Sequence, residues 1–157
     1  MKLFNKLLVV IAVVCASACS SGSSKSSAPT STTSAVTKAA YLAQGNTICK
    51  TMNQRIAALG DPPDDPVDIA ARFEQIHVII GEALVELRLV PVPPGEEAKI
   101  AAVYATVDKV QKDAPAYSAA LRAGNQQAAA AARKKVAADQ ARANAAAVGY
   151  GLTACGS

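Results

Sequence analysis

The sequence has no tryptophan, only two phenylalanines and four tyrosines, and a single histidine. Large aromatic side chains supply much of the buried area of a protein core, so this chain has little material for a thick one. The one histidine, His77, has no cysteine, histidine or carboxylate partner at the spacing of a zinc or catalytic site, and we expect it at the edge of a helix stripe. Phosphate-binding loops, nucleotide fingerprints and Ser/His/Asp groupings are also missing. The chain is therefore not expected to be an enzyme or to hold a cofactor.

A long hydrophobic run is missing too. The uncharged segment 7–18 has an apolar centre at 7–14 and follows Lys2 and Lys6. Such a centre is well short of the ~20 apolar residues that a membrane-spanning helix needs. A basic start followed by a short apolar segment is typical of a signal peptide, so residues 1–18 are predicted to be removed and are left out of the fold.

Small residues lead up to a cysteine at the end of this segment. The run Ala16-Ser17-Ala18-Cys19 resembles a bacterial lipobox, although Ala16 stands where that family usually has Leu, Val or Ile. The resemblance implies cleavage between Ala18 and Cys19, a lipid thioether on Cys19, and often an acylated new N-terminus. Two or three acyl chains would anchor the protein stably in the cell membrane, on its extracytoplasmic face. The alternative is an ordinary secretory signal with Cys19 incidental.

Residues 20–38 read SSGSSKSSAPTSTTSAVTK. Serine, threonine and glycine leave almost nothing to bury, so residues 19–38 are predicted to form a flexible linker with a span on the order of 25 Å. Residues 39–157 then suit one domain with a modest core.

Alanine accounts for much of the apolar content of that domain. Alanine favours helices, and no segment shows the period-two pattern of a strand, so the domain is predicted to be all-α. Four helices are expected over about 37–59, 65–90, 96–123 and 126–148, joined by short connections as an antiparallel up-down four-helix bundle. Pro115 is expected to kink or split the third helix, and the fourth is expected to bury mostly alanine. The clearest amphipathic stripe lies in the second helix and comprises Ile69, Phe73, Ile76, Ile80, Leu84 and Leu87.

Four cysteines are present. Cys15 would leave with the signal and Cys19 would carry lipid, so Cys49 and Cys155 remain to form one disulfide in an oxidising compartment. In an antiparallel bundle the start of the first helix lies beside the end of the fourth, and residues 149–151 can turn the tail back. A reactive or metal-binding pair is the alternative, but the sequence has neither a CxxC motif nor a histidine near these cysteines.

The two ends of the domain show a further resemblance. The segments YLAQGNTIC (41–49) and YGLTACG (150–156) are similar to the ends of small alanine-rich helical lipoproteins from high-GC Gram-positive bacteria. That resemblance implies a cell-envelope location and the same cysteine pairing. It implies no activity.

The charge of the chain indicates no particular class of partner. Loss of residues 1–18 lowers the formal net charge from +4 to +2, because Lys2 and Lys6 are removed. The remaining basic face of the fourth helix comprises Arg133, Lys134, Lys135 and Arg142. It is either a solvated face or a contact for anionic lipid or acidic envelope polymer, and nucleic acid is not an expected partner outside the cytoplasm.

Two other arrangements are disfavoured. The acidic residues Asp61, Asp64, Asp65 and Asp68 lack the spacing of a calcium loop and are predicted to form a solvated turn with a helix cap. Haem ligation by Met52 and His77 is an awkward fit, because the two residues should differ in height by about 6 Å or more along the bundle.

Two functions remain open. The first is a non-enzymatic tethered interaction or accessory module that contacts an envelope protein partner through an exposed apolar or alanine-rich strip. The second is a carrier or sensor of a small apolar ligand. In that case Gly45, Gly81 and the alanines of the fourth helix would leave a cleft beside Tyr104 and Tyr117. The identity of the ligand stays open.

Overall fold

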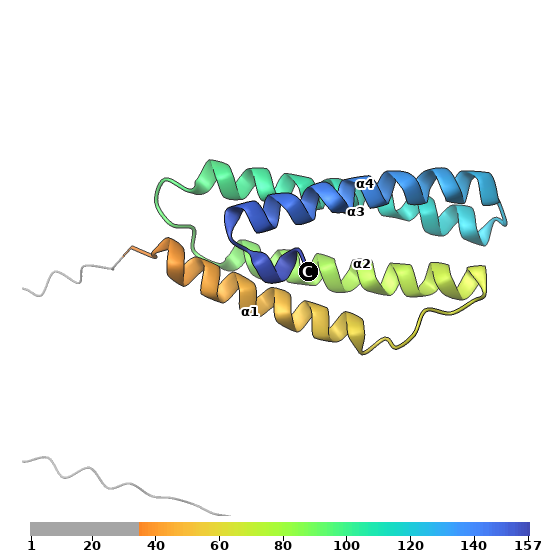
Figure 1. The fold of residues 1–157 in the computed structure, drawn as a ribbon, viewed down its shortest axis with the longest axis horizontal. Coiled ribbons are helices and arrows are strands. Elements are labelled where there is room, and N and C mark those ends of the chain that lie inside the picture. Colours follow the sequence, from red (N-terminus) through yellow and green to blue (C-terminus); the bar gives the residue numbers. More distant parts are fainter. Residues whose placement is uncertain (1–34) are drawn as a thin grey trace, which may run out of the picture. The chain divides into compact units, whose positions relative to one another are not determined.

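The computed structural model describes residues 35–157, which form four α-helices and one 3₁₀ turn without any strand (Figure 1). The elements are α1 (Lys38–Ala57), α2 (Pro66–Leu89), α3 (Glu97–Arg122), α4 (Gln126–Tyr150) and the turn η1 (Thr153–Cys155). This confirms the all-α four-helix fold. The predicted signal peptide, the proposed lipid site Cys19 and most of the predicted linker lie outside the described residues.

Side-chain caps fix where three of the helices begin. At the start of α1, Thr37 Oγ1 accepts a hydrogen bond from Ala40 N at 3.2 Å. At the start of α2, Asp65 Oδ1 accepts one from Val67 N at 2.8 Å, and at the start of α4, Asn125 Oδ1 accepts one from Ala128 N at 3.0 Å. Each bond satisfies a backbone donor that has no partner within its helix. The helix ends lie within about two residues of the predicted ones; α1 includes Lys38, which was assigned to the linker.

Pro115 does not divide α3, which is one helix from Glu97 to Arg122. The predicted split is therefore wrong. Pro115 is exposed, while Ala114 and Ser118 are buried. The proline ring thus lies on the side of α3 that faces water and not in the core, and α3 continues through it.

The packing of the helices is uneven. α2, α3 and α4 contact one another in chain order, and α1 packs against α2. No Cα atom of α1 comes within 8 Å of a Cα atom of α4, whereas η1 contacts both helices. The C-terminal turn therefore fills the space between the backbones of these two helices, and Figure 1 shows it there.

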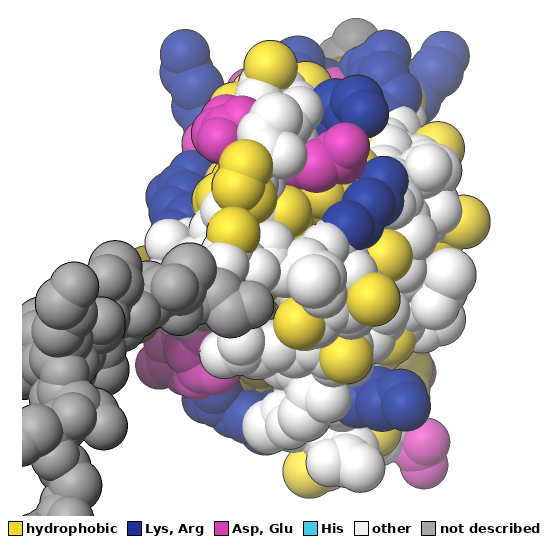
Figure 2. All heavy atoms as spheres, turned by 90° about the vertical axis from the view of Figure 1, so that its left-hand side faces the viewer, with side chains coloured by type: hydrophobic (Ala, Val, Ile, Leu, Met, Phe, Trp, Pro, Cys, Tyr) yellow, Lys and Arg dark blue, Asp and Glu magenta, His cyan; other side chains and the backbone are white. Residues whose placement is uncertain are grey.

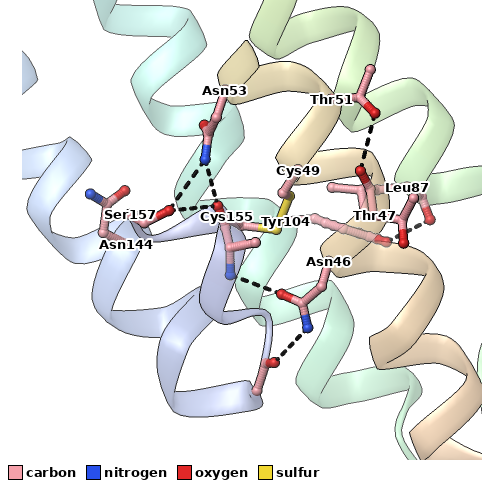
Figure 3. Close-up of a disulfide and its surroundings, with 12 residues drawn as sticks. Asn46, Thr47, Cys49, Thr51, Asn53, Leu87, Tyr104, Asn144, Cys155 and Ser157 are labelled. Atoms are coloured by element: carbon pink, nitrogen blue, oxygen red, sulfur yellow. Dashed lines mark hydrogen bonds between the residues drawn. A yellow bond between two sulfur atoms is a disulfide. The ribbon is translucent and has the colours of Figure 1, made fainter. Parts of the chain in front are cut away.

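Several bonds hold this turn in place (Figure 3). Gly151 adopts a left-handed conformation (φ 112°) and reverses the chain after α4, and Leu152 behind it is 1% exposed. A disulfide joins Cys49 of α1 to Cys155 of η1, with their Cα atoms 4.9 Å apart. Asn46 bridges the same two segments, since its amide donates to Gly151 O at 3.1 Å and accepts from Ala154 N at 2.8 Å. These contacts fasten the C-terminal turn to α1, and Leu152 directly before it lies in the core.

Tyrosines fill the end of the bundle where α1 begins. Tyr41 is fully buried, its hydroxyl lies 2.7 Å from that of Tyr104, and Tyr104 donates to Leu87 O at 2.8 Å. Tyr150 packs edge-on against Tyr41 with 6.0 Å between ring centroids. Burial raises the pKa of all three phenols, that of Tyr150 to about 12 with a further contribution from the Glu96 carboxylate.

Figure 2 views this end of the molecule and shows acidic, basic and hydrophobic side chains intermixed rather than one continuous patch. Across residues 35–157, no helix combines the length and the apolar character needed to cross a membrane.

Candidate functional site: an open groove between α2 and α4

The amphipathic stripe of α2 is covered over only part of its length. Leu84 and Leu87 are buried, but Ile69, Phe73 and Ile76 are only partly covered. Figure 1 shows the reason: α1 ends part-way along α2, and the 58–65 connection runs on toward the start of α2. The N-terminal halves of α2 and α4 therefore border an open groove of about 470 Å³, and no residue of α1 lines it.

Apolar side chains from three helices form the surface of this groove. The stripe residues Ile69, Phe73, Ile76 and Ile80 come from α2, Tyr117 from α3, and Val136 and Ala137 from α4. The Phe73 ring packs edge-on against Tyr117 at 4.9 Å and contacts the His77 ring at 4.4 Å between centroids. Interlocked rings of this kind give a fixed floor, because each limits the rotation of its neighbour.

The connection between α1 and α2 forms the wall at one end. Arg72 donates from its guanidinium to the backbone carbonyls of Leu59 (2.8 Å) and Asp61 (3.0 Å), and also to that of Gly60. These bonds hold the connection in which Pro62 and Pro63 line the groove. Arg72 therefore shapes the end wall, with its charge already directed at peptide carbonyls.

His77 lies at the edge of the groove, as expected for a histidine beside the α2 stripe. Its Nδ1 is 2.5 Å from Gln111 Oε1, and Gln111 Nε2 donates to His77 O at 2.9 Å. Since an amide oxygen only accepts, Nδ1 carries the proton in this arrangement. Burial lowers the pKa of the imidazole, with Gln111 opposing the shift, so the neutral form is favoured. The ring is held as an uncharged part of the wall.

A small internal cavity of about 60 Å³ lies deeper in the bundle. Met52, Leu84, Val107 and Leu152 are among its mostly apolar lining residues. Ile80 and Gln140 line both this cavity and the groove, so the two spaces adjoin at that pair. Met52 lines the cavity and His77 lines the groove, so the two side chains considered as haem ligands do not line one common space.

The cleft predicted beside the small residues differs from the observed groove. Tyr104 lines the internal cavity and Tyr117 lines the groove, so the two tyrosines do not share one cleft. The space above Gly45 is taken by Leu152, whose Cδ2 lies 2.6 Å from where a Cβ would stand, and Gln111 lies 3.0 Å from the equivalent position at Gly81. These glycines permit close packing, and the groove arises from the short α1.

The basic face of α4 is divided between two environments. Lys135 pairs with Asp113 at 2.6 Å, and Arg142 pairs with Asp139, while Lys109 bridges Asp113 (2.8 Å) and Asp139 (2.7 Å). Arg133 lines the groove, and neither it nor Lys134 has an ion-pair partner within residues 35–157. Only part of the predicted basic face is therefore available to an anion.

Asp139 is a buried charge that the sequence reasoning missed; its residue is 1% exposed. Its bonds to Lys109 and then to Arg142 lower its pKa and keep it ionised. One signal was available: Asp139 falls three residues after Val136 and four before Ala143, on the stripe that α4 buries.

In the described part of the chain, no group of three His, Cys, Asp or Glu residues is placed to hold a metal ion. Comparisons of the chain with protein-family models, curated proteins and solved structures gave no match. The groove is therefore the feature of the domain that bears on its function.

Proposed function

We propose that this chain is a lipoprotein of the cell envelope whose folded domain is a tethered binding module with no catalytic role. The lipobox-like run that ends at Cys19 supports the anchor, and the Ser/Thr-rich segment after it supports the tether. On this proposal the domain stands on the extracytoplasmic face of the cell membrane, where an oxidising environment suits the Cys49–Cys155 disulfide.

Of the two binding functions, the groove favours the holding of a small apolar ligand. Its volume of about 470 Å³ lies within the range of about 300–1,000 Å³ that is usual for ligand sites, and most of its surface is apolar. A four-helix bundle with a full-length α1 would cover Ile69, Phe73 and Ile76. A ligand seated there would remove the same surface from water, a gain of roughly 25 cal/mol per Å².

A protein-contact function is the second candidate, supported by the outer face of α2. Val78, Val85 and Leu89 are 60%, 57% and 78% exposed and lie at helical spacing on one side of that helix. They form the exposed apolar strip that a partner protein of the envelope would cover. Photocrosslinking from position 85 in intact envelopes would identify such a partner, and this function falls if no adduct forms.

The ligand function is tested by filling the groove. Ala137 is exposed and lines the groove, whereas Ala138 is exposed and lies outside the groove lining. In residues 19–157 carrying Cys19→Ser, we expect the neutral probe N-phenyl-1-naphthylamine to bind with enhanced fluorescence. Ala137→Trp should weaken this binding by about tenfold or more, and Ala138→Trp should leave it within about twofold, because only the first occupies the apolar volume.

Circular dichroism would show whether both variants keep the helical fold of the parent. Equal binding by the two tryptophan variants, or no probe binding by the parent protein, would refute a ligand site in the groove.

A further inference from the structure

We propose that the groove holds a free single-chain anionic amphiphile such as a fatty acid, with its head at Arg133 and its chain directed toward Ile80 and Gln140. This inference rests on the proposed ligand function and adds the class of ligand and its orientation. Charge, direction and size each support it.

Charge makes the groove complementary to an anion. Its lining residues include two arginines, Arg72 and Arg133, and no aspartate or glutamate. Arg72 is bonded to the carbonyls of the 59–61 segment, whereas Arg133 is exposed and has no ion pair in the described residues. The acidic residues of the 61–68 turn are not among the lining residues. A carboxylate head would therefore meet a cation with donors to spare at Arg133.

The direction of the chain follows from the way α2 and α4 run. Both helices start at the same end of the bundle (Figure 1), so Arg133 and Phe73 lie near that end, while Ile80 and Gln140 lie further along. Arg133 and Gln140 are separated by about 10 Å along α4. Beyond them the internal cavity continues between apolar side chains. An acyl chain that starts at Arg133 thus has an apolar course along the groove and toward the cavity.

The length of the groove suits an acyl chain. Its lining runs from Ile69 to Ile80, about 16 Å along α2, and Pro62 and Pro63 stand at its end. An amphipathic helix binds through several turns of apolar contacts, whereas an extended hydrocarbon chain needs only a narrow channel.

Decanoate and decanol separate recognition of the head from burial of the chain, because the two probes differ only in the head group. Calorimetric titrations would use residues 19–157 carrying Cys19→Ser, at pH 7.5 and low salt. We expect the parent protein to bind decanoate about three- to fivefold more tightly than decanol, as suits a single exposed ion pair. Arg133→Gln should abolish the preference and retain decanol binding. Lys134→Gln, which removes the adjacent charge outside the groove, should keep the preference.

Other results would contradict the anionic head, the free ligand or the ligand function itself. Equal binding of decanoate and decanol by the parent protein would refute the anionic head and leave the ligand function standing. Failure of both probes to bind would refute both proposals together. Arg133-dependent binding to phosphatidylglycerol vesicles without any binding of decanoate would show that the cation contacts a membrane surface, and the free amphiphile would be the wrong ligand. A preference that survives 0.5 M salt and Arg133→Gln would place the anion elsewhere.

Discussion

Removal of the Cys49–Cys155 disulfide should lower the stability of the domain by several kcal/mol. The two cysteines are 106 residues apart in the sequence, so the bond closes almost the whole domain into one loop. In the chain-entropy description, a loop of that length costs the unfolded chain about 4–5 kcal/mol of conformational freedom. The turn that carries Cys155 keeps its other anchors, including the Asn46 hydrogen bonds and buried Leu152, so the fold itself should survive.

The perturbation is the double substitution Cys49→Ala with Cys155→Ala. Alanine is preferred to serine because Cys49 is only 1% exposed, and a hydroxyl there would be buried without an assured partner. For a domain of about 120 residues, each kcal/mol shifts the thermal midpoint by roughly 4 °C, so the midpoint should fall by about 15–20 °C. Differential scanning calorimetry of the parent and the variant measures this shift directly.

Reductant provides the internal control. It should lower the parent protein to the midpoint of the double variant and leave the variant unchanged, since only the parent has a bond to reduce. A fall of less than about 4 °C would contradict this prediction, because it would mean that the bond destabilises the unfolded chain by less than about 1 kcal/mol.

Two other predictions concern the buried charge and the anchor. The Lys109 ammonium is the first cause of the lowered pKa values of Asp113 and Asp139, so their contribution is complete above about pH 4 and lost as the pH falls further. Thermal midpoints between pH 2 and 7 should therefore fall less steeply for Asp139→Asn, and parallel profiles would contradict this. When residues 1–18 have been cleaved, Cys19→Ser should move the protein from the membrane fraction to the soluble fraction. A cleaved Cys19→Ser protein that stays in the membrane fraction would refute a lipid anchor.

Helix positions could be predicted well from local residues. The acidic turn was predicted to cap a helix, and Asp65 caps α2; the helix-period stripe of α2 placed Leu84 and Leu87 on a buried face. These signals act within a few residues, where capping and side-chain spacing decide the outcome. Pro115 shows the limit of such reasoning, because its effect depended on which side of α3 faces water.

The groove could not be predicted from the same signals. The stripe from Ile69 to Leu87 reads as one buried face, yet its first half lines an opening. Which half is covered depends on where α1 ends along α2, and this is set by packing between distant segments. Asp139 is a similar case, because its burial depends on Lys109 reaching it from α3. The stripe residues and Asp139 can be read in the sequence, but whether each is buried or exposed depends on how the helices are arranged.

The C-terminal turn has a consequence for the order of events in synthesis. Leu152 and Cys155 follow all four helices in the sequence, yet their side chains fill the space between α1, the earliest of the helices, and α4. A nascent chain that lacks these residues cannot complete its core, however much of the rest has emerged. The domain therefore stays open until Leu152 and Cys155 have been added, which suits a polypeptide that, on our proposal, is threaded through a membrane in an unfolded state.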